Sequence, residues 1–156
     1  KFDTLEIRIA DCCTRIDEAV CVAALIQALI ARLIDMRKEN QSWRAYRRFH
    51  IVENKWRAMR YGIQGKLIDF GKKLEVPTNF LILEIIDLVD EVLDRLDCRE
   101  EVEYARTIVE NGTSADRQLA TYRDALASGA SEEEALRAVV DRLILESMEG
   151  IDSAAV

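Results

Sequence analysis

The sequence contains few of the residues that interrupt helices. It has one proline, Pro77, and six glycines among 156 residues. Because proline and glycine mark turns, this scarcity argues against a many-stranded sandwich and favours long helices. With 49% hydrophobic and 33% charged residues, the composition is globular rather than disordered. We expect one domain over residues 1–150 and a frayed tail over 151–156.

Metal-binding and thiol chemistry are also poorly represented. The sequence has one histidine, His50, and four cysteines (Cys12, Cys13, Cys21 and Cys98), none of which forms a CxxC pair. A zinc site needs about four nitrogen or sulfur ligands at suitable spacing, and this pattern lacks them. The pattern predicts reduced, buried thiols in a cytoplasmic protein. A lone histidine is more often a surface or core residue than a general base.

Positive charge is outnumbered, since 22 lysines and arginines stand against 29 aspartates and glutamates and the formal net charge is −7. On average such a surface repels nucleic acid and anionic lipid, so we expect neither as a partner. The longest apolar run, 19–31, is interrupted by Gln27 and ends at Arg32. It is shorter than the about 20 residues of a membrane span, which favours a buried helix.

The apolar periodicity predicts a mostly helical α+β fold. Residues 4–10 alternate apolar and polar side chains, which is the period of a half-buried strand that needs neighbouring strands. Helices are expected at about 15–38, 43–61, 79–97, 99–110, 115–128 and 132–149, with a short extended piece at 66–70. Thr14 is expected to cap the first helix, and Ser131 with Glu134 to form a capping box before the last.

Glu6 and Arg8 are the first candidate site. Residues two apart on a strand point to the same face. The carboxylate suits Mg²⁺, and the guanidinium forms a planar fork onto phosphoryl oxygens. The alternative is a solvated ion pair on a sheet surface, and the pattern by itself leaves both interpretations open.

A basic helix is the second candidate. Residues 43–61 carry six cations against one acid, Glu53. Asn54, Arg57 and Tyr61 share a helical face with Arg60 alongside, and such a surface attracts anions. The interleaved aromatic residues are Trp43, Tyr46, Phe49 and Trp56. They suit stacking on nucleic acid, which the net charge opposes, or an ordinary core.

The third candidate is the segment Asn111-Gly-Thr-Ser-Ala-Asp-Arg117. A tight turn followed by the amides of a helix N-terminus can hold an anion. A capped junction between two helices has the same pattern. Both interpretations stay open from the sequence.

Three segments of the chain resemble the type 2 glutamate–cysteine ligase family. They are Thr4-Leu-Glu-Ile-Arg-Ile-Ala-Asp-Cys-Cys-Thr-Arg-Ile-Asp-Glu18, Glu53-Asn-Lys-Trp-Arg-Ala-Met-Arg-Tyr-Gly62, and Asn111-Gly-Thr-Ser-Ala-Asp-Arg-Gln118. Three motifs in order are more specific than any one of them. The resemblance is to the C-terminal part of the family's catalytic domain, and it covers most of the chain.

The resemblance implies a fold and a reaction. The fold is similar to the catalytic domain of glutamine synthetase, a curved antiparallel sheet with helices outside, to which the strand at 4–10 would belong. The reaction is an ATP-dependent ligation in which a glutamate-like carboxylate is phosphorylated and a cysteine-like amine attacks the acyl phosphate. Such phosphoryl transfer needs Mg²⁺ and cationic groups that neutralise developing charge.

The resemblance also implies roles for individual residues. Glu6 looks like a Mg²⁺ ligand and Arg8 like the catalytic contact to the transferring phosphate. Three residues of the basic helix resemble a group that binds nucleotide phosphate or substrate carboxylate; they are Asn54, Arg57 and Arg60. Thr113, Asp116 and Arg117 match the family's turn without an implied role.

The chain departs from the family by lacking its other metal-binding carboxylates and its N-terminal strands. We therefore expect the N-terminal remainder of the domain as a partner, from the same gene or a second chain, and no activity from this chain alone. We also expect an oligomer. The ligase hypothesis requires Glu6 and Arg8 to project together beside a concave sheet. The alternative is a non-catalytic helical interaction module whose basic helix binds an acidic partner.

Overall fold

A computed structural model of the chain describes residues 4–42 and 44–149. Its elements are α1 (Ile16–Lys38), α2 (Arg48–Tyr61), the 3-10 turn η1 (Gly62–Gln64), β1 (Lys66–Asp69), β2 (Leu74–Pro77), α3 (Thr78–Leu96), α4 (Arg99–Asn111), α5 (Ser114–Ala127) and α6 (Glu132–Met148). The mostly helical α+β class is confirmed. The basic helix begins at Arg48, later than the expected residue 43. Trp43 and the predicted tail at 151–156 lie outside the described residues.

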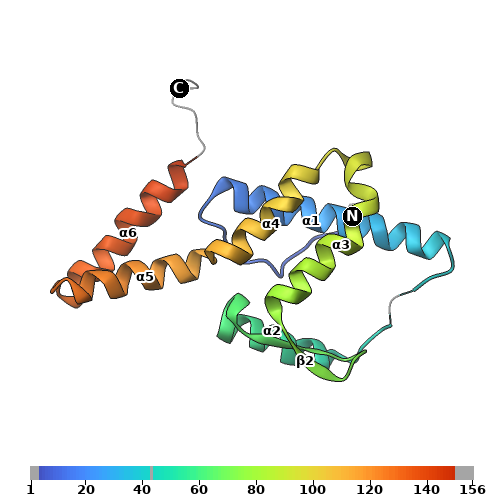
Figure 1. Cartoon of the computed structure of the whole chain (residues 1–156), viewed down its shortest axis with the longest axis horizontal. Helices are drawn as coiled ribbons and strands as arrows, with labels where there is room; N and C mark the ends of the chain where they lie inside the picture. Colours follow the sequence, from blue (N-terminus) through green and yellow to red (C-terminus); the bar gives the residue numbers. More distant parts are fainter. Residues whose placement is uncertain (1–3, 43, 150–156) are drawn as a thin grey trace.

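The core is formed by α1, α3 and α4, which pack on one another (Figure 1). The apolar stripe of α3 buries Ile86, Val89 and Leu93 almost completely. Val102 of α4 and Ala28 of α1 are fully buried against it. A stripe of this kind has the 3.6-residue period of an amphipathic helix, which is why the sequence folds here as predicted.

Helix α1 is 23 residues long, and by length and composition it could cross a membrane. The apolar run in the sequence suggested a shorter segment. In the structure α1 packs against both α3 and α4, and Cys21 is fully buried there. This packing covers one face of α1, while Val20, Leu33 and Ile34 remain 44%, 38% and 51% exposed.

The two-stranded sheet is an antiparallel hairpin. Its register pairs Lys66 with Pro77 and Asp69 with Leu74. The Asp69 carboxylate accepts hydrogen bonds from the amides of Gly71 and Lys72, both 2.8 Å long, and so closes the turn. The extended piece expected at 66–70 is confirmed.

The strand expected at 4–10 is not formed. Residues 4–13 have no regular secondary structure, and the strands of the described ranges, β1 and β2, pair with each other. A strand needs a ladder partner, and the side chains of Leu5 and Ile9 are 71% and 68% exposed. Thr14 does not cap α1 either, because the cap position is Arg15, without a side-chain hydrogen bond.

Helices α5 and α6 form a hairpin that projects away from the core (Figure 1). Ala135 of α6 is fully buried, whereas Leu136, Val140 and Ile144 form an exposed apolar stripe. Both helices begin with capping boxes. The box of Ser131 with Glu134 is confirmed, and the corresponding box of α5 joins Thr113 to Asp116.

Candidate functional site

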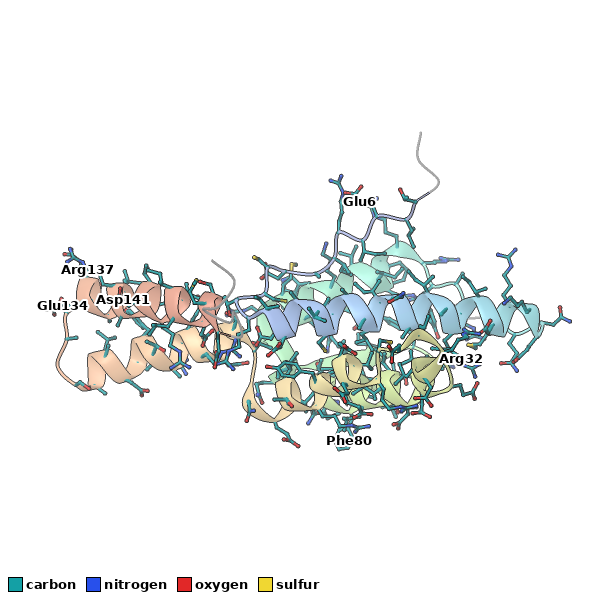
Figure 2. The ribbon with its side chains drawn as sticks, turned by 90° about the horizontal axis from the view of Figure 1, so that it is seen from above. Glu6, Arg32, Phe80, Glu134, Arg137 and Asp141 are labelled. Atoms are coloured by element: carbon teal, nitrogen blue, oxygen red, sulfur yellow. The ribbon has the colours of Figure 1, made fainter. Side chains whose placement is uncertain are left out.

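Glu6 and Arg8 lie side by side, as their spacing predicted. The Nε of Arg8 is 2.7 Å from one carboxylate oxygen of Glu6, and its Nη2 donates to the other at 3.1 Å. The two side chains are 69% and 81% exposed, and Glu6 projects away from the helices (Figure 2). The described residues place no concave sheet beside the pair, so the cavity that the ligase hypothesis requires is absent from this part of the chain.

Two cysteines follow this pair directly. Cys12 is exposed, contrary to the expected burial, and Cys13 is half-buried. Partial burial, followed by the charge of Glu18, raises the pKa of Cys13 above its ordinary value. Because a reactive thiol needs a lowered pKa, the geometry gives Cys13 no nucleophilic role. Cys21 and Cys98 are buried as expected.

The described residues do not complete a metal site. Across 4–42 and 44–149, no three His, Cys, Asp or Glu side chains gather as potential ligands. Mg²⁺ prefers six oxygen ligands in an octahedron, with one or two protein carboxylates and the rest from water and phosphate. Glu6 therefore fits as one ligand and does not hold the ion unaided.

Asn54 and Arg57 attach α2 to the β1–β2 hairpin. Asn54 donates from Nδ2 to the Ile68 carbonyl at 2.9 Å and accepts from the Ile68 amide at 2.8 Å. Arg57 lies 2.8 Å from a Glu53 oxygen and 2.6 Å from a Glu75 oxygen. These hydrogen bonds, first that of Glu53, raise the pKa of Arg57 above its ordinary value. Each strand thus holds α2 by one polar clamp.

Arg60 lies at the end of the same helix and is exposed. The structure therefore separates the three predicted binding residues. Asn54 and Arg57 make structural contacts, while Arg60 presents its guanidinium to solvent. The sequence placed all three on one side of the helix, and spacing alone did not distinguish them.

An open groove of about 690 Å³ lies beside α2. Its apolar lining residues are Phe49, Val52, Trp56, Ile68 and Phe70, and His50 and Glu53 also line it. The His50 ring packs on both phenylalanine rings, and its Nδ1 is buried without a hydrogen-bond partner among the described residues. Since Phe49 and Trp56 are 61% and 49% exposed, the aromatic residues of α2 do not form an ordinary core.

The third motif forms a turn that aims Arg117 inward. Gly112 adopts a φ of 84°, which favours glycine, and its carbonyl accepts from Arg117 Nη1 at 3.2 Å. Asp116 accepts from the amide and hydroxyl of Thr113. Of the two interpretations left open by the sequence, the structure shows the capped junction between helices. The cap does not use the Arg117 side chain, which stays available for contacts beyond the turn.

Arg117 is the centre of a buried polar network that sequence reasoning missed. Its guanidinium is 2.9 Å from Glu146, 2.7 Å from Glu18 and 3.3 Å from the Thr14 hydroxyl. Burial would raise the pKa of Glu146, but hydrogen bonds from Arg117, Arg142 and Thr14 outweigh it and lower the pKa to about 2. Apart from the local Arg142–Glu146 pair, these contacts join residues 29 to 132 positions apart, so no local pattern signals the network.

Comparison with known proteins identifies the class and then the family. The sequence model of a ligase family, described as "Glutamate-cysteine ligase family 2", matches residues 2–142. The chain belongs to this family. No solved structure gives a significant match.

Three relatives are provisionally named glutamate–cysteine ligase 2. One from Roseiflexus sp. is 53% identical over 150 residues, which cover 96% of this chain and 38% of the relative. One from Chloroflexus aurantiacus is 51% identical over 154 residues, covering 99% and 37%. One from Rhodospirillum rubrum is 49% identical over 148 residues, covering 95% and 38%. The chain thus spans little more than a third of the length of these relatives.

Proposed function

We propose that this chain is part of a ligase domain that joins a glutamate-like carboxylate to a cysteine-like amine at the expense of ATP. Family membership supports the class of enzyme. The match of the family model over residues 2–142 is the observation that carries the proposal, and the exposed Glu6–Arg8 pair is its candidate reacting group, with the concave sheet left to the rest of the domain. Family membership also favours it over a non-catalytic interaction module.

The chemistry of this proposal proceeds in two steps. The substrate carboxylate oxygen attacks the γ-phosphorus of ATP and ADP departs, which leaves an acyl phosphate. The amine then attacks the acyl carbon, phosphate departs, and the amine proton is lost. Charge on the transferring phosphoryl oxygens is stabilised by the planar fork of Arg8.

In this proposal Glu6 contributes one carboxylate oxygen toward Mg²⁺, which neutralises phosphate charge when bound. The exposed contact between Glu6 and Arg8 is weak in water, so it opens readily. Glu6 then turns to the cation and Arg8 to the phosphate. The remaining metal ligands come from the rest of the intact domain.

The proposed binding group on α2 is Asn54, Arg57 and Arg60. Arg60 is exposed and makes the direct contact to nucleotide phosphate or substrate carboxylate. Asn54 and Arg57 fix α2 on the hairpin and so determine where Arg60 points. A guanidinium suits either anion because its donors match two oxygens at once.

The partner in this proposal is the remainder of the domain, which the relatives carry and which exceeds half their length. It supplies strands beside residues 4–10 and covers Leu5 and Ile9, which alone are largely exposed. This chain by itself is then inactive, and it associates in the cytoplasm with the missing part. Exposed apolar side chains of this kind mark a surface that contacts another polypeptide segment, which in this proposal is the rest of the domain.

The test is Glu6→Gln in the intact ligase domain, assayed for product formation that depends on ATP, glutamate and cysteine. We expect a loss of at least about a hundredfold in kcat, because an electrostatic contact to the transition state is removed. The melting temperature should change little, since glutamine keeps the size and shape of the glutamate side chain. Glu39→Gln, an exposed glutamate at the end of α1, is the control. A wild-type rate in Glu6→Gln rules out the metal role.

A further inference from the structure

We propose that Arg117 and Thr14 are positioning residues for the ligation: their buried network anchors the end of the segment that carries Glu6 and Arg8. The inference rests on the proposed function. It gives a role to the third sequence motif, whose turn the proposed chemistry does not use. The segment 4–13 has no regular secondary structure in the described chain. Its position relative to the helices is therefore set at the point where it joins them, which is Thr14.

The Thr14 hydroxyl is the meeting point of the network. It lies 3.0 Å from a Glu146 oxygen, 3.3 Å from Arg117 Nη2 and 2.9 Å from the Ser114 hydroxyl. A carboxylate only accepts and a guanidinium only donates, so the Thr14 proton goes to Glu146 and its lone pair to Arg117. Ser114 then donates to Thr14 and accepts from Gln118 Nε2 at 2.9 Å. One proton assignment thus satisfies every contact of the hydroxyl.

The network joins elements that are remote in sequence. Glu18 belongs to the first turn of α1, Arg117 to the start of α5, and Glu146 to the end of α6. Glu18 and Glu146 are only 6% and 4% exposed, yet both pair with Arg117. A fully paired buried charge cluster stabilises a fold about as well as apolar packing would, so its distinctive contribution is a defined geometry.

That geometry bears on the candidate site through the length of the intervening chain. Six residues separate Thr14 from Arg8, and an extended chain covers at most about 3.5 Å per residue. The anchor therefore holds the end of the segment at Thr14 and confines Arg8 to within roughly 20 Å of it. A shift of about 1 Å at a reacting group can cost a hundredfold in rate.

The direct test is Thr14→Val in the intact ligase. Valine keeps the shape of threonine and removes only the hydroxyl. We expect kcat to fall by about tenfold to a hundredfold, with KM for ATP within a factor of two and little change in melting temperature. Thr121→Val is the matched control, since the Thr121 hydroxyl bonds the Arg117 carbonyl at 2.9 Å and not its side chain. Its kcat should equal that of wild type.

A second variant separates positioning from stability. Glu18→Leu, Arg117→Met and Glu146→Leu together replace the three buried charges by apolar side chains; Arg15 and Arg142, which also contact Glu146, are 26% and 44% exposed and stay hydrated, so folding is preserved. We expect a wild-type melting temperature with the lowered kcat of Thr14→Val. A wild-type kcat in either folded variant overturns the proposal and leaves the network a structural contact only.

Amide hydrogen exchange of residues 4–13 in the same proteins distinguishes the two proposals. Exchange should accelerate in Thr14→Val and stay at the wild-type rate in Thr121→Val. If the wild-type domain forms no product that depends on ATP, glutamate and cysteine, the proposed function fails, and positioning for ligation fails with it even if exchange shows that Thr14 anchors the segment. If Glu6→Gln is inactive while Thr14→Val keeps wild-type kcat and exchange, the ligase proposal stands and the anchor is refuted.

Discussion

The core of α1, α3 and α4 and the peripheral unit of α2 with its hairpin use apolar residues in opposite ways. In the core, Val89, Leu93 and Val102 are fully shielded from solvent. In α2 no residue is buried, and Met59 is 70% exposed. The contacts among α1, α3 and α4 therefore shield a set of apolar side chains from solvent, whereas in the described chain the apolar side chains of α2 stay partly or largely exposed.

The two regions also differ in what holds them together. The core coheres through apolar packing, which is non-directional and tolerates small shifts. Helix α2 is attached by directional contacts, among them the paired hydrogen bonds of Asn54 with Ile68. The projecting α5–α6 hairpin resembles α2 in this respect, because its Arg117–Glu146 contact is also polar. Directional contacts suit regions whose orientation a larger site depends on.

The largest expected effect is that of a cavity in the core. Leu93→Ala removes buried methyl groups and should lower the free energy of unfolding by about 3–5 kcal/mol. Leu145→Ala is the control on the outer face of α6, where Leu145 is 72% exposed, and should cost less than about 0.5 kcal/mol. Urea unfolding followed by circular dichroism measures both. Equal losses of unfolding free energy in the two variants would show that the outer face of α6 is covered in solution. The contrast between a buried core and exposed outer faces would then be wrong.

The second effect concerns the pH dependence of stability. The folded-state pKa of Glu146 is about 2, below its ordinary value of 4.5. The ionised form is therefore favoured by folding, and its contribution is complete above pH 4.5 and lost as the pH falls toward 2. The difference corresponds to about 3 kcal/mol.

Glu146→Gln isolates this contribution from those of other carboxylates. The variant should be less stable than wild type at pH 7, because Arg117 keeps Glu18 but loses the second of its two carboxylate partners. The difference in the free energy of unfolding between wild type and Glu146→Gln should disappear as the pH falls from 4.5 to 2. Urea unfolding at pH 7, 4.5, 3 and 2 measures this difference. A difference that stays constant with pH would contradict the lowered pKa of Glu146.

Local patterns predicted most of the fold. The helix expected at about 79–97 and the capping box of Ser131 with Glu134 depend on residues within a few helical turns, which the sequence displays directly. The pairing of Glu6 with Arg8 was likewise readable from a spacing of two. The i, i+4 pair of Glu53 with Arg57 was visible in the sequence and explains one contact of Arg57.

Features that depend on distant partners were not predictable. Thr14 has the residue type of a helix cap, but its hydroxyl is used by Glu146, 132 residues away. Residues 4–10 have the period of a strand, but strand formation requires a neighbour that β1 and β2 do not provide. Asn54 was assigned to binding because nothing local reveals that its amide fits the backbone of Ile68.

The third effect tests the clamp on α2. Asn54→Ala removes two hydrogen bonds and leaves the Ile68 amide and carbonyl unsatisfied, which should cost about 2 kcal/mol. Lys55→Ala, at an exposed neighbouring position, should leave the unfolding midpoint unchanged. Exchange of the Ile68 amide should accelerate in Asn54→Ala while amides of the core keep their protection. A uniform acceleration would show that α2 and the core unfold as one unit.

The smallest effect lies in the α5–α6 hairpin, where local signals rather than deep burial define the ends of the helices. The Ser131 hydroxyl accepts from the Glu134 amide at 3.3 Å, so Ser131→Ala should cost about 1 kcal/mol. Ser147→Ala, which removes a hydroxyl bonded to the Ile144 carbonyl in the last turn, should cost less because it leaves no orphan amide. Urea unfolding of both variants compares them. An equal loss would mean that the hairpin is held by packing, as the core is, and not by its caps.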